Sequence, residues 1–189
     1  MEALALAAEF YDRDTAAHVS RVAILARELA RAFGCSPRFV RGIGPSARVH
    51  DVGKMTIPME LLLKVGPLTP EEEQLLRQHT VNGSRLLGTL PQLEMARNIC
   101  FYHHENYDGT GYPRGLAGEA IPLEARIVRL VDVYDALRSQ RPYKPPLTHE
   151  EALTVLTTGD SRVRPENFDP QLLSLFPAVV AKHLHLYGP

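Results

Sequence analysis

Residues 15–33 read TAAHVSRVAILARELARAF, and this stretch predicts a half-buried helix. Its apolar residues recur every three or four positions, which is the spacing of one helical face. Gly34 then favours an end to the helix, and Ser36, followed by a proline, is typical of the start of the next one. We expect this second helix to run toward His50 and to end at Gly53. The apolar positions of the first helix are Val19, Val22, Ala26, Leu29, Ala30 and Phe33.

Helical patterns dominate the remaining chain, and strand signals are nearly absent. Thr69, followed by a proline and two glutamates, predicts a capped helix start. The segment 105–121, ENYDGTGYPRGLAGEAI, is too rich in glycine to be a helix, and long loops in compact domains usually carry function. The sequence therefore predicts one all-α domain over residues 1–189 with a long glycine-rich loop. Helices are expected near 70–89, 91–104, 122–138, 148–157 and 169–185.

Composition restricts the class of protein. The 189 residues are 44% hydrophobic and 23% charged, which is typical of a soluble globular chain. A net charge of −1 disfavours a broadly basic DNA- or RNA-binding protein. The two cysteines suit reduced thiols, and we see neither a signal peptide nor a membrane-spanning run. We expect a cytoplasmic protein.

Several histidines have neighbours that suggest chemistry. His18 lies on or beside the apolar stripe of its helix, with Asp14 one turn earlier, and the two form either a structural pair or part of a site. His50 and Asp51 are adjacent, with Lys54 one turn further on. Consecutive helical side chains diverge by about 100°, so such a pair reaches two nearby ions more easily than each other.

Asp132 is the most informative carboxylate. It lies in ARIVRLVDVYDAL, which is apolar nearly all round, and burying an unpaired carboxylate costs several kcal/mol. Arg129 is one candidate partner, a solvent-facing gap is another explanation, and a metal ion explains the placement better. His103 and His104 at a helix end, and His79 on another helix, add nitrogen donors. A nitrogen and oxygen donor set without thiolate suits Fe, Mn, Co, Ni or Zn in a two-metal hydrolytic site.

These motifs also carry a family resemblance. HDVGK at 50–54 and HHENYDGTGYP at 103–113, with DTAAHVSRV at 14–22 and DVYDALRSQRPYK at 132–144, resemble the HD-GYP subgroup of the HD-domain phosphohydrolases. The resemblance implies a bundle of about seven helices with a long GYP loop that holds two or three divalent ions, Fe or Mn above all. It also implies hydrolysis of cyclic di-GMP to linear pGpG, in some members further to GMP, by a hydroxide that bridges two ions, and whether one or two steps occur here stays open.

Individual roles follow from the same resemblance. Asp51 and Lys54 are implied to be catalytic, and Asp14 stands where three-metal members have Glu, so a third ion stays open. Met59 and Val65 depart from the usual pattern away from the ligands, and 159–167 is expected to be a surface loop. The implied metal ligands are Asp14, His18, His50, Asp51, His79, His103, His104 and Asp132. The implied substrate contacts are Lys54, Gly111, Tyr112, Pro113, Arg114, Asp135, Arg141 and Lys144.

The resemblance places the catalytic motifs within 14–144 and C-terminal helices within 148–189 of a single HD-GYP domain. The expected partner is a cyclic dinucleotide, and a homodimer and a regulatory or signalling protein partner stay open. Two alternatives remain: an HD-type phosphohydrolase for another cyclic dinucleotide or nucleotide, and a non-catalytic module that binds the dinucleotide. All seven ligands from His18 to Asp132 are present beside Lys54, which disfavours the second alternative.

Overall fold

The computed structural model describes residues 16–139 and 145–188. Within these ranges the regular secondary structure is helical, with eight α-helices, so the predicted all-α fold is confirmed. No described helix has both the length and the apolar character needed to cross a bilayer. Asp14, Arg141 and Lys144 lie outside the described residues. The α-helices are α2 (Ala16–Ala32), α3 (Pro37–Ala47), α4 (Met59–Leu62), α5 (Pro70–Leu86), α6 (Glu94–Tyr102), α7 (Leu123–Arg138), α8 (His149–Thr158) and α9 (Pro170–Val180).

Short 3₁₀ helices connect or extend these elements. They are η1 (Val52–Thr56), η2 (Pro91–Leu93), η3 (Gly118–Ala120), η4 (Pro165–Asn167) and η5 (Ala181–Tyr187). The single helix expected near 169–185 is therefore α9 followed by η5. The expected starts are confirmed, because Ser36 accepts a hydrogen bond from the Phe39 N–H and Thr69 forms a capping box with Glu72.

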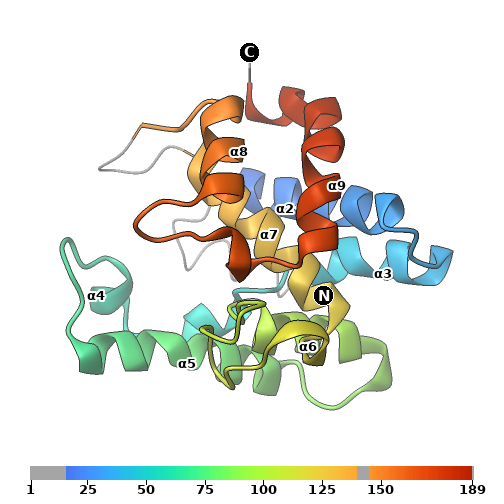
Figure 1. Cartoon of the computed structure of the whole chain (residues 1–189). Coiled ribbons are helices and arrows are strands. Elements are labelled where there is room, and N and C mark those ends of the chain that lie inside the picture. The colour runs from blue at the N-terminus through green and yellow to red at the C-terminus, as the bar shows by residue number, and fades with distance from the viewer. Residues whose placement is uncertain (1–15, 140–144, 189) are drawn as a thin grey trace.

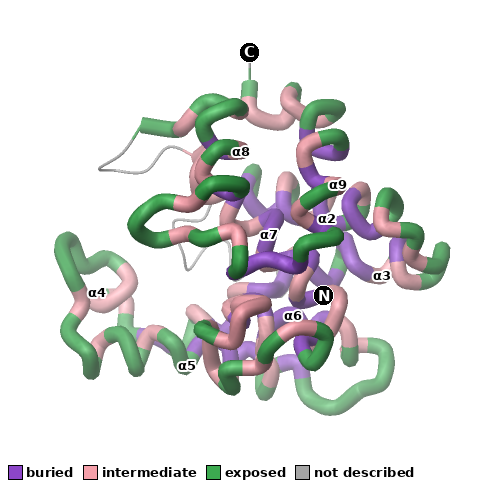
Figure 2. Tube along the Cα trace, viewed as in Figure 1, coloured by how far each residue is buried: buried purple, intermediate pink, exposed green. Residues whose placement is uncertain are grey.

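Helix α7 is the centre of the bundle. It packs against α2, α6, α8 and α9, and Figure 1 shows it between the pair α8 and α9 and the pair α5 and α6. Its residues Ile127, Val128, Leu130, Val131 and Tyr134 are fully buried. Figure 2 shows the buried positions concentrated along α7 and its neighbours, so a polar side chain on this helix is held rigidly.

The second helix ends earlier than the sequence pattern predicts. α3 stops at Ala47, and His50 and Asp51 lie in the turn before η1, not on a helix that continues to Gly53. After this turn η1 approaches α5 closely: a Cβ on Gly53 would lie 1.9 Å from the His79 carbonyl oxygen. This contact brings the turn that carries Asp51 against the helix that carries His79.

The loop 105–121 is fixed by its own polar groups. Glu105 is buried, and its carboxylate accepts hydrogen bonds from the backbone N–H groups of Arg114 at 2.7 Å and Leu116 at 3.0 Å. The segment 159–167, expected to be a surface loop, packs on this loop, because Arg164 and Asn167 both donate to Asp108, at 2.7 and 3.1 Å. The two segments support each other beside α7.

Candidate metal centre

The predicted ligands that the structure describes converge into two groups. Asp51, His79, His103 and His104 form one group, and His18, His50 and Asp132 form the other. Within each group the candidate ligand atoms lie within 4.8 Å of one another. They come from α2, α5 and α7, from the turn before η1, and from the end of α6, so the fold is what assembles them.

Asp51 lies between the two groups. Its Oδ1 is 3.3 Å from His79 Nε2 and 3.4 Å from His103 Nε2. Its Oδ2 is 3.3 Å from His50 Nε2, in the other group, and 2.9 Å from Lys54 Nζ. Asp132 Oδ1 lies 3.7 Å from His18 Nε2 and 3.9 Å from His50 Nε2. The two oxygens of Asp51 therefore face different ligand groups.

Partners of the Nδ1 atoms, on the side of each ring away from Nε2, orient four of the histidines. The Nδ1 atoms of His50 and His79 lie 2.8 and 2.7 Å from the carbonyl oxygens of Ala47 and Leu76, and that of His103 lies 3.0 Å from the oxygen of Ile99. His18 Nδ1 lies 2.7 Å from the carboxylate of Asp135. When Nδ1–H donates to these oxygens, Nε2 carries a free lone pair toward the centre, which is the usual arrangement of metal-binding histidine.

Several candidate ligand atoms of this centre are buried without hydrogen-bond partners. This is true of the Nε2 atoms of His50, His79 and His103 and of Asp51 Oδ1. Buried polar atoms normally have partners, because desolvation without a hydrogen bond costs free energy. Four such atoms that converge on one place fit divalent cations as their missing partners, and no thiolate is present to favour a structural zinc.

The pKa shifts of these side chains agree with a site for cations. Burial opposes a charge on His50, yet the carboxylates of Asp51 and Asp132 raise its pKa to about 9. Burial lowers the pKa of His79 to about 4, so its Nε2 is unprotonated at neutral pH. Burial also opposes ionisation of Asp51, but Lys54 and His50 hold its pKa well below the usual value. The acidic centre attracts positive charge, which a proton on His50 or a bound cation can supply.

Asp135 lies behind the ligands and is fully buried. Its carboxylate accepts hydrogen bonds from Arg21 Nε at 2.6 Å, Tyr187 Oη at 2.7 Å and Ser139 Oγ at 3.1 Å, besides its contact with His18. Burial would raise the pKa of Asp135, but Arg21 and His18 lower it strongly. Asp135 was expected among the substrate contacts; the structure places its buried carboxylate against His18, and the substrate contact stays a prediction.

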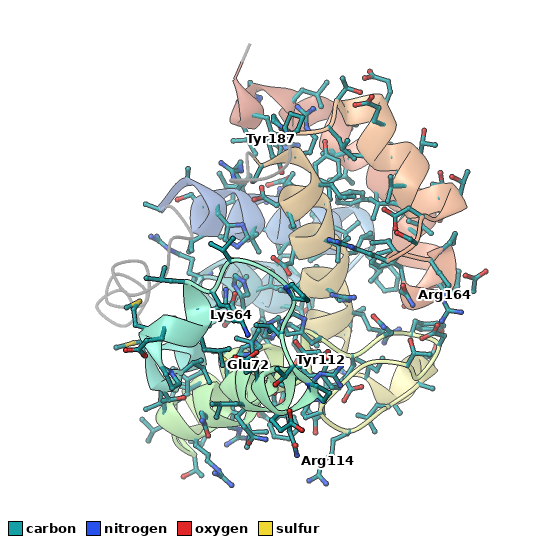
Figure 3. The ribbon with its side chains drawn as sticks, turned by 90° about the vertical axis from the view of Figure 1, so that its left-hand side faces the viewer. Lys64, Glu72, Tyr112, Arg114, Arg164 and Tyr187 are labelled. Atoms are coloured by element: carbon teal, nitrogen blue, oxygen red, sulfur yellow. The ribbon has the colours of Figure 1, made fainter. Side chains whose placement is uncertain are left out.

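The glycine-rich loop closes one side of the centre. The ring of Tyr112 stacks on His104 with centroids 4.8 Å apart, and the Arg77 guanidinium covers Tyr112 at 4.7 Å. Gly111 is required by a close approach, because a Cβ there would lie 2.3 Å from the Asn106 nitrogen. Arg114 is exposed, its guanidinium lies over the Phe101 ring, and Figure 3 shows it at the edge of the molecule away from Tyr112. The structure therefore does not bring Arg114 to the ligands.

Arg129 is a residue of this region whose placement sequence analysis missed. It lies one turn before Asp132 on α7, is half-buried, and donates from Nε to Asn106 Oδ1 at 3.1 Å. Burial lowers its pKa, although Asp132 acts in the opposite direction. The available signal was its position three residues before a ligand in an apolar helix, which suggested only a partner for Asp132.

The fold and the site together define a class: an all-helical domain that gathers histidines and aspartates into a metal-binding centre. Residues 3–172 match the family model of the HD domain, so the chain belongs to the HD domain family. The family predicted from the sequence motifs is thus confirmed.

Curated relatives carry names of related activities. A cyclic di-GMP phosphodiesterase of Vibrio cholerae is 40% identical over 95% of this chain and 39% of its own length. The cyclic di-GMP phosphodiesterase response regulator RpfG of Xanthomonas campestris is 44% identical over 89% of this chain and 44% of its own length. A 3′3′-cGAMP-specific phosphodiesterase 2 of V. cholerae is 37% identical over 91% of this chain and 33% of its own length. The chain spans less than half the length of these relatives.

A solved structure supports the fold. Bd1817, an HDG"Y"P protein from Bdellovibrio bacteriovorus, superposes with a TM-score of 0.66 at 21% identity, over 87% of this chain and 51% of that chain. At this identity the likeness concerns the fold alone.

Proposed function

We propose that this chain is a metal-dependent phosphodiesterase that hydrolyses cyclic di-GMP to linear pGpG, and in a second step to GMP. The observation that carries the proposal is Asp51, whose two oxygens face two separate ligand groups. An aspartate in this position suits the bridge of a two-metal hydrolytic site. The names of the relatives in V. cholerae and X. campestris support the substrate class.

In this proposal the residues of the centre have separate roles. The histidines and Asp132 would hold the cations, and Asp51 would serve both positions. When bound, a pair of divalent cations polarises the phosphate, activates the attacking water and stabilises the leaving oxygen. The nitrogen and oxygen donor set suits Fe or Mn, and a third ion would need Asp14.

Lys54 is placed to stabilise charge. Its ammonium lies 2.9 Å from Asp51 Oδ2, at the edge of the centre, and its side chain is 20% exposed. Two cations would compete with Lys54 for Asp51, and the ammonium could then turn toward a phosphate oxygen at the edge of the centre. In that position Lys54 stabilises the negative charge that develops on the phosphate during cleavage.

A second candidate substrate is another cyclic dinucleotide, which the 37% identity to a 3′3′-cGAMP-specific enzyme favours. The non-catalytic binding module is disfavoured by the seven described ligands together with Lys54. The further expectations of a single cytoplasmic domain, a homodimer and a regulatory protein partner stay predictions.

The test is product chromatography after the protein has been loaded with Mn or Fe. Cyclic di-GMP, 3′3′-cGAMP and cyclic di-AMP are incubated separately with the protein and with two histidine variants. We expect pGpG from cyclic di-GMP at the highest kcat/KM, loss of product in His79→Gln, and normal product in the matched control His185→Gln, whose imidazole is exposed in η5. A higher kcat/KM for another of the three dinucleotides would make that dinucleotide the assigned substrate. No hydrolysis of any of the three would refute the enzymatic function.

A further inference from the structure

A cavity of about 270 Å³ opens beside the metal centre. One wall belongs to α7, which contributes Arg129 and the ligand Asp132, and the opposite wall belongs to the segment after α8, with Asp160 and Arg162. Small-molecule sites usually measure about 300–1,000 Å³. The cavity is therefore suited to a part of a ligand whose remainder lies over the metal centre.

The two arginines of this cavity differ from two other arginines of the bundle, which form ion pairs. Arg21 is paired with Asp135 at 2.6 Å, and Arg126 is paired with Asp169 at 2.5 Å. Within the described part of the chain, neither Arg129 nor Arg162 has a carboxylate within ion-pair distance. Arg129 donates to the neutral amide of Asn106, and the carboxylates of Asp132 and Asp108 act on it only from beyond ion-pair distance, so a half-buried cation lines the cavity without a direct ion pair.

The segment that carries Arg162 is held in place. The Asp160 Oδ1 accepts hydrogen bonds from the backbone N–H groups of Arg162 and Val163, both at 2.7 Å. The Asp160 N–H in turn donates to the Val163 carbonyl at 2.8 Å. The ion pair of Arg164 with Asp108 then ties the segment to the loop 105–121. The guanidinium of Arg162 thus extends from a braced turn, in which one oxygen of Asp160 accepts from two backbone amides.

We propose that this cavity is an anion subsite, in which Arg129 and Arg162 hold the phosphodiester of the substrate that is not being cleaved. The inference rests on the proposed function, because a cyclic dinucleotide carries two phosphodiesters and only one reaches the cations at a time. Planar guanidinium groups bind phosphate oxygens through paired, charge-assisted hydrogen bonds. Arg129 forms the inner wall, next to Asp132, and Arg162 forms the outer wall, where its side chain is exposed to solvent.

The experiment compares a substrate that has two phosphodiesters with a substrate that has one. KM and kcat are measured for cyclic di-GMP and for bis(p-nitrophenyl) phosphate with the Mn-loaded parent, Arg129→Gln and Arg162→Ala. Arg41→Ala, an exposed arginine of α3, is the matched control. Thermal unfolding checks that Arg129→Gln is folded, and Arg162→Ala tests the proposal at an exposed position where the fold does not depend on the side chain.

We expect the KM for cyclic di-GMP to rise about tenfold or more in Arg129→Gln and about three- to tenfold in Arg162→Ala, the smaller effect reflecting solvent screening. The KM for bis(p-nitrophenyl) phosphate stays at the parent value in both variants. Unchanged KM for cyclic di-GMP in Arg162→Ala, or an equal rise for both substrates, overturns the subsite.

Failure of the proposed function gives a different result, in which the parent hydrolyses neither substrate. Calorimetric titration of the same Mn-loaded proteins with cyclic di-GMP then replaces KM. Weaker binding to the two variants than to the parent and Arg41→Ala supports the subsite as a binding site, whereas equal binding, or no binding to the parent, refutes it.

Discussion

The contact of His18 with Asp135 predicts that one metal position can be weakened without the other. His18 belongs to the group with His50 and Asp132, and its Nδ1 lies 2.7 Å from Asp135 Oδ2. In Asp135→Asn the ring of His18 loses a charged acceptor. Removal of such a partner behind a ligand typically lowers metal affinity by about 10- to 100-fold. The group of Asp51, His79, His103 and His104 does not contact Asp135 and keeps its affinity.

The same variant also destabilises the fold, because Arg21 loses its buried counter-charge. Leaving one partner of a buried ion pair alone costs about 3–5 kcal/mol. Tyr187→Phe is the milder perturbation, since it removes a single 2.7 Å hydrogen bond to Asp135 and keeps the ion pair. A hydrogen bond to a charged group contributes about 1.5–3 kcal/mol, so we expect Tyr187→Phe to lower the free energy of unfolding by that amount.

The assay is stepwise calorimetric titration of metal-free protein with Mn²⁺, paired with urea unfolding. We expect two binding steps in the parent and one weakened step in Asp135→Asn, with a smaller weakening of that step in Tyr187→Phe. The matched control is Tyr107→Phe, because the Tyr107 hydroxyl makes no hydrogen bond within the described residues. Equal weakening of both steps, or two unchanged steps in a folded Asp135→Asn, would refute the positioning role of Asp135.

Three further substitutions test the centre itself. Asp51→Ala should abolish hydrolysis and lower metal content at both positions, because one carboxylate serves both groups; parent-level turnover would exclude the bridging role. Lys54→Ala should keep its metals and lose about 10²–10³-fold in kcat, the usual effect of deleting one electrostatic stabiliser; metal analysis of the same preparation separates this result from a structural defect. Gly53→Ala should lose at least about 1–3 kcal/mol of stability and some metal, because its Cβ would meet the His79 carbonyl at 1.9 Å; an unchanged urea midpoint would contradict the close approach.

The candidate metal ligands could be predicted because each carries a local signal. Asp132 is a carboxylate in an otherwise apolar helix, and His50 with Asp51 and His103 with His104 are adjacent pairs. The helix starts at Ser36 and Thr69 could also be predicted from nearby residues, because a capping side chain bonds within the first turn of its helix. These features depend on neighbours in sequence, so they can be recognised without knowledge of the fold.

What could not be predicted depends on contacts between distant segments. α3 ends at Ala47 although the local pattern predicted a helix as far as Gly53, and the contact of Gly53 with α5 lies outside that pattern. The role of Asp135 depends on Tyr187, which lies 52 residues away and beyond the residues that match the HD domain model. The cavity likewise combines Arg129 with Arg162, which comes from a segment expected to be a surface loop.

The central claim is that one chain holds two cations joined by Asp51, and metal counting tests it most directly. Protein purified without chelator and reconstituted with Mn or Fe is analysed by elemental mass spectrometry against protein concentration. We predict at least two equivalents per chain, with fewer than two in Asp51→Ala. Less than one equivalent in the reconstituted parent would contradict the two-metal centre.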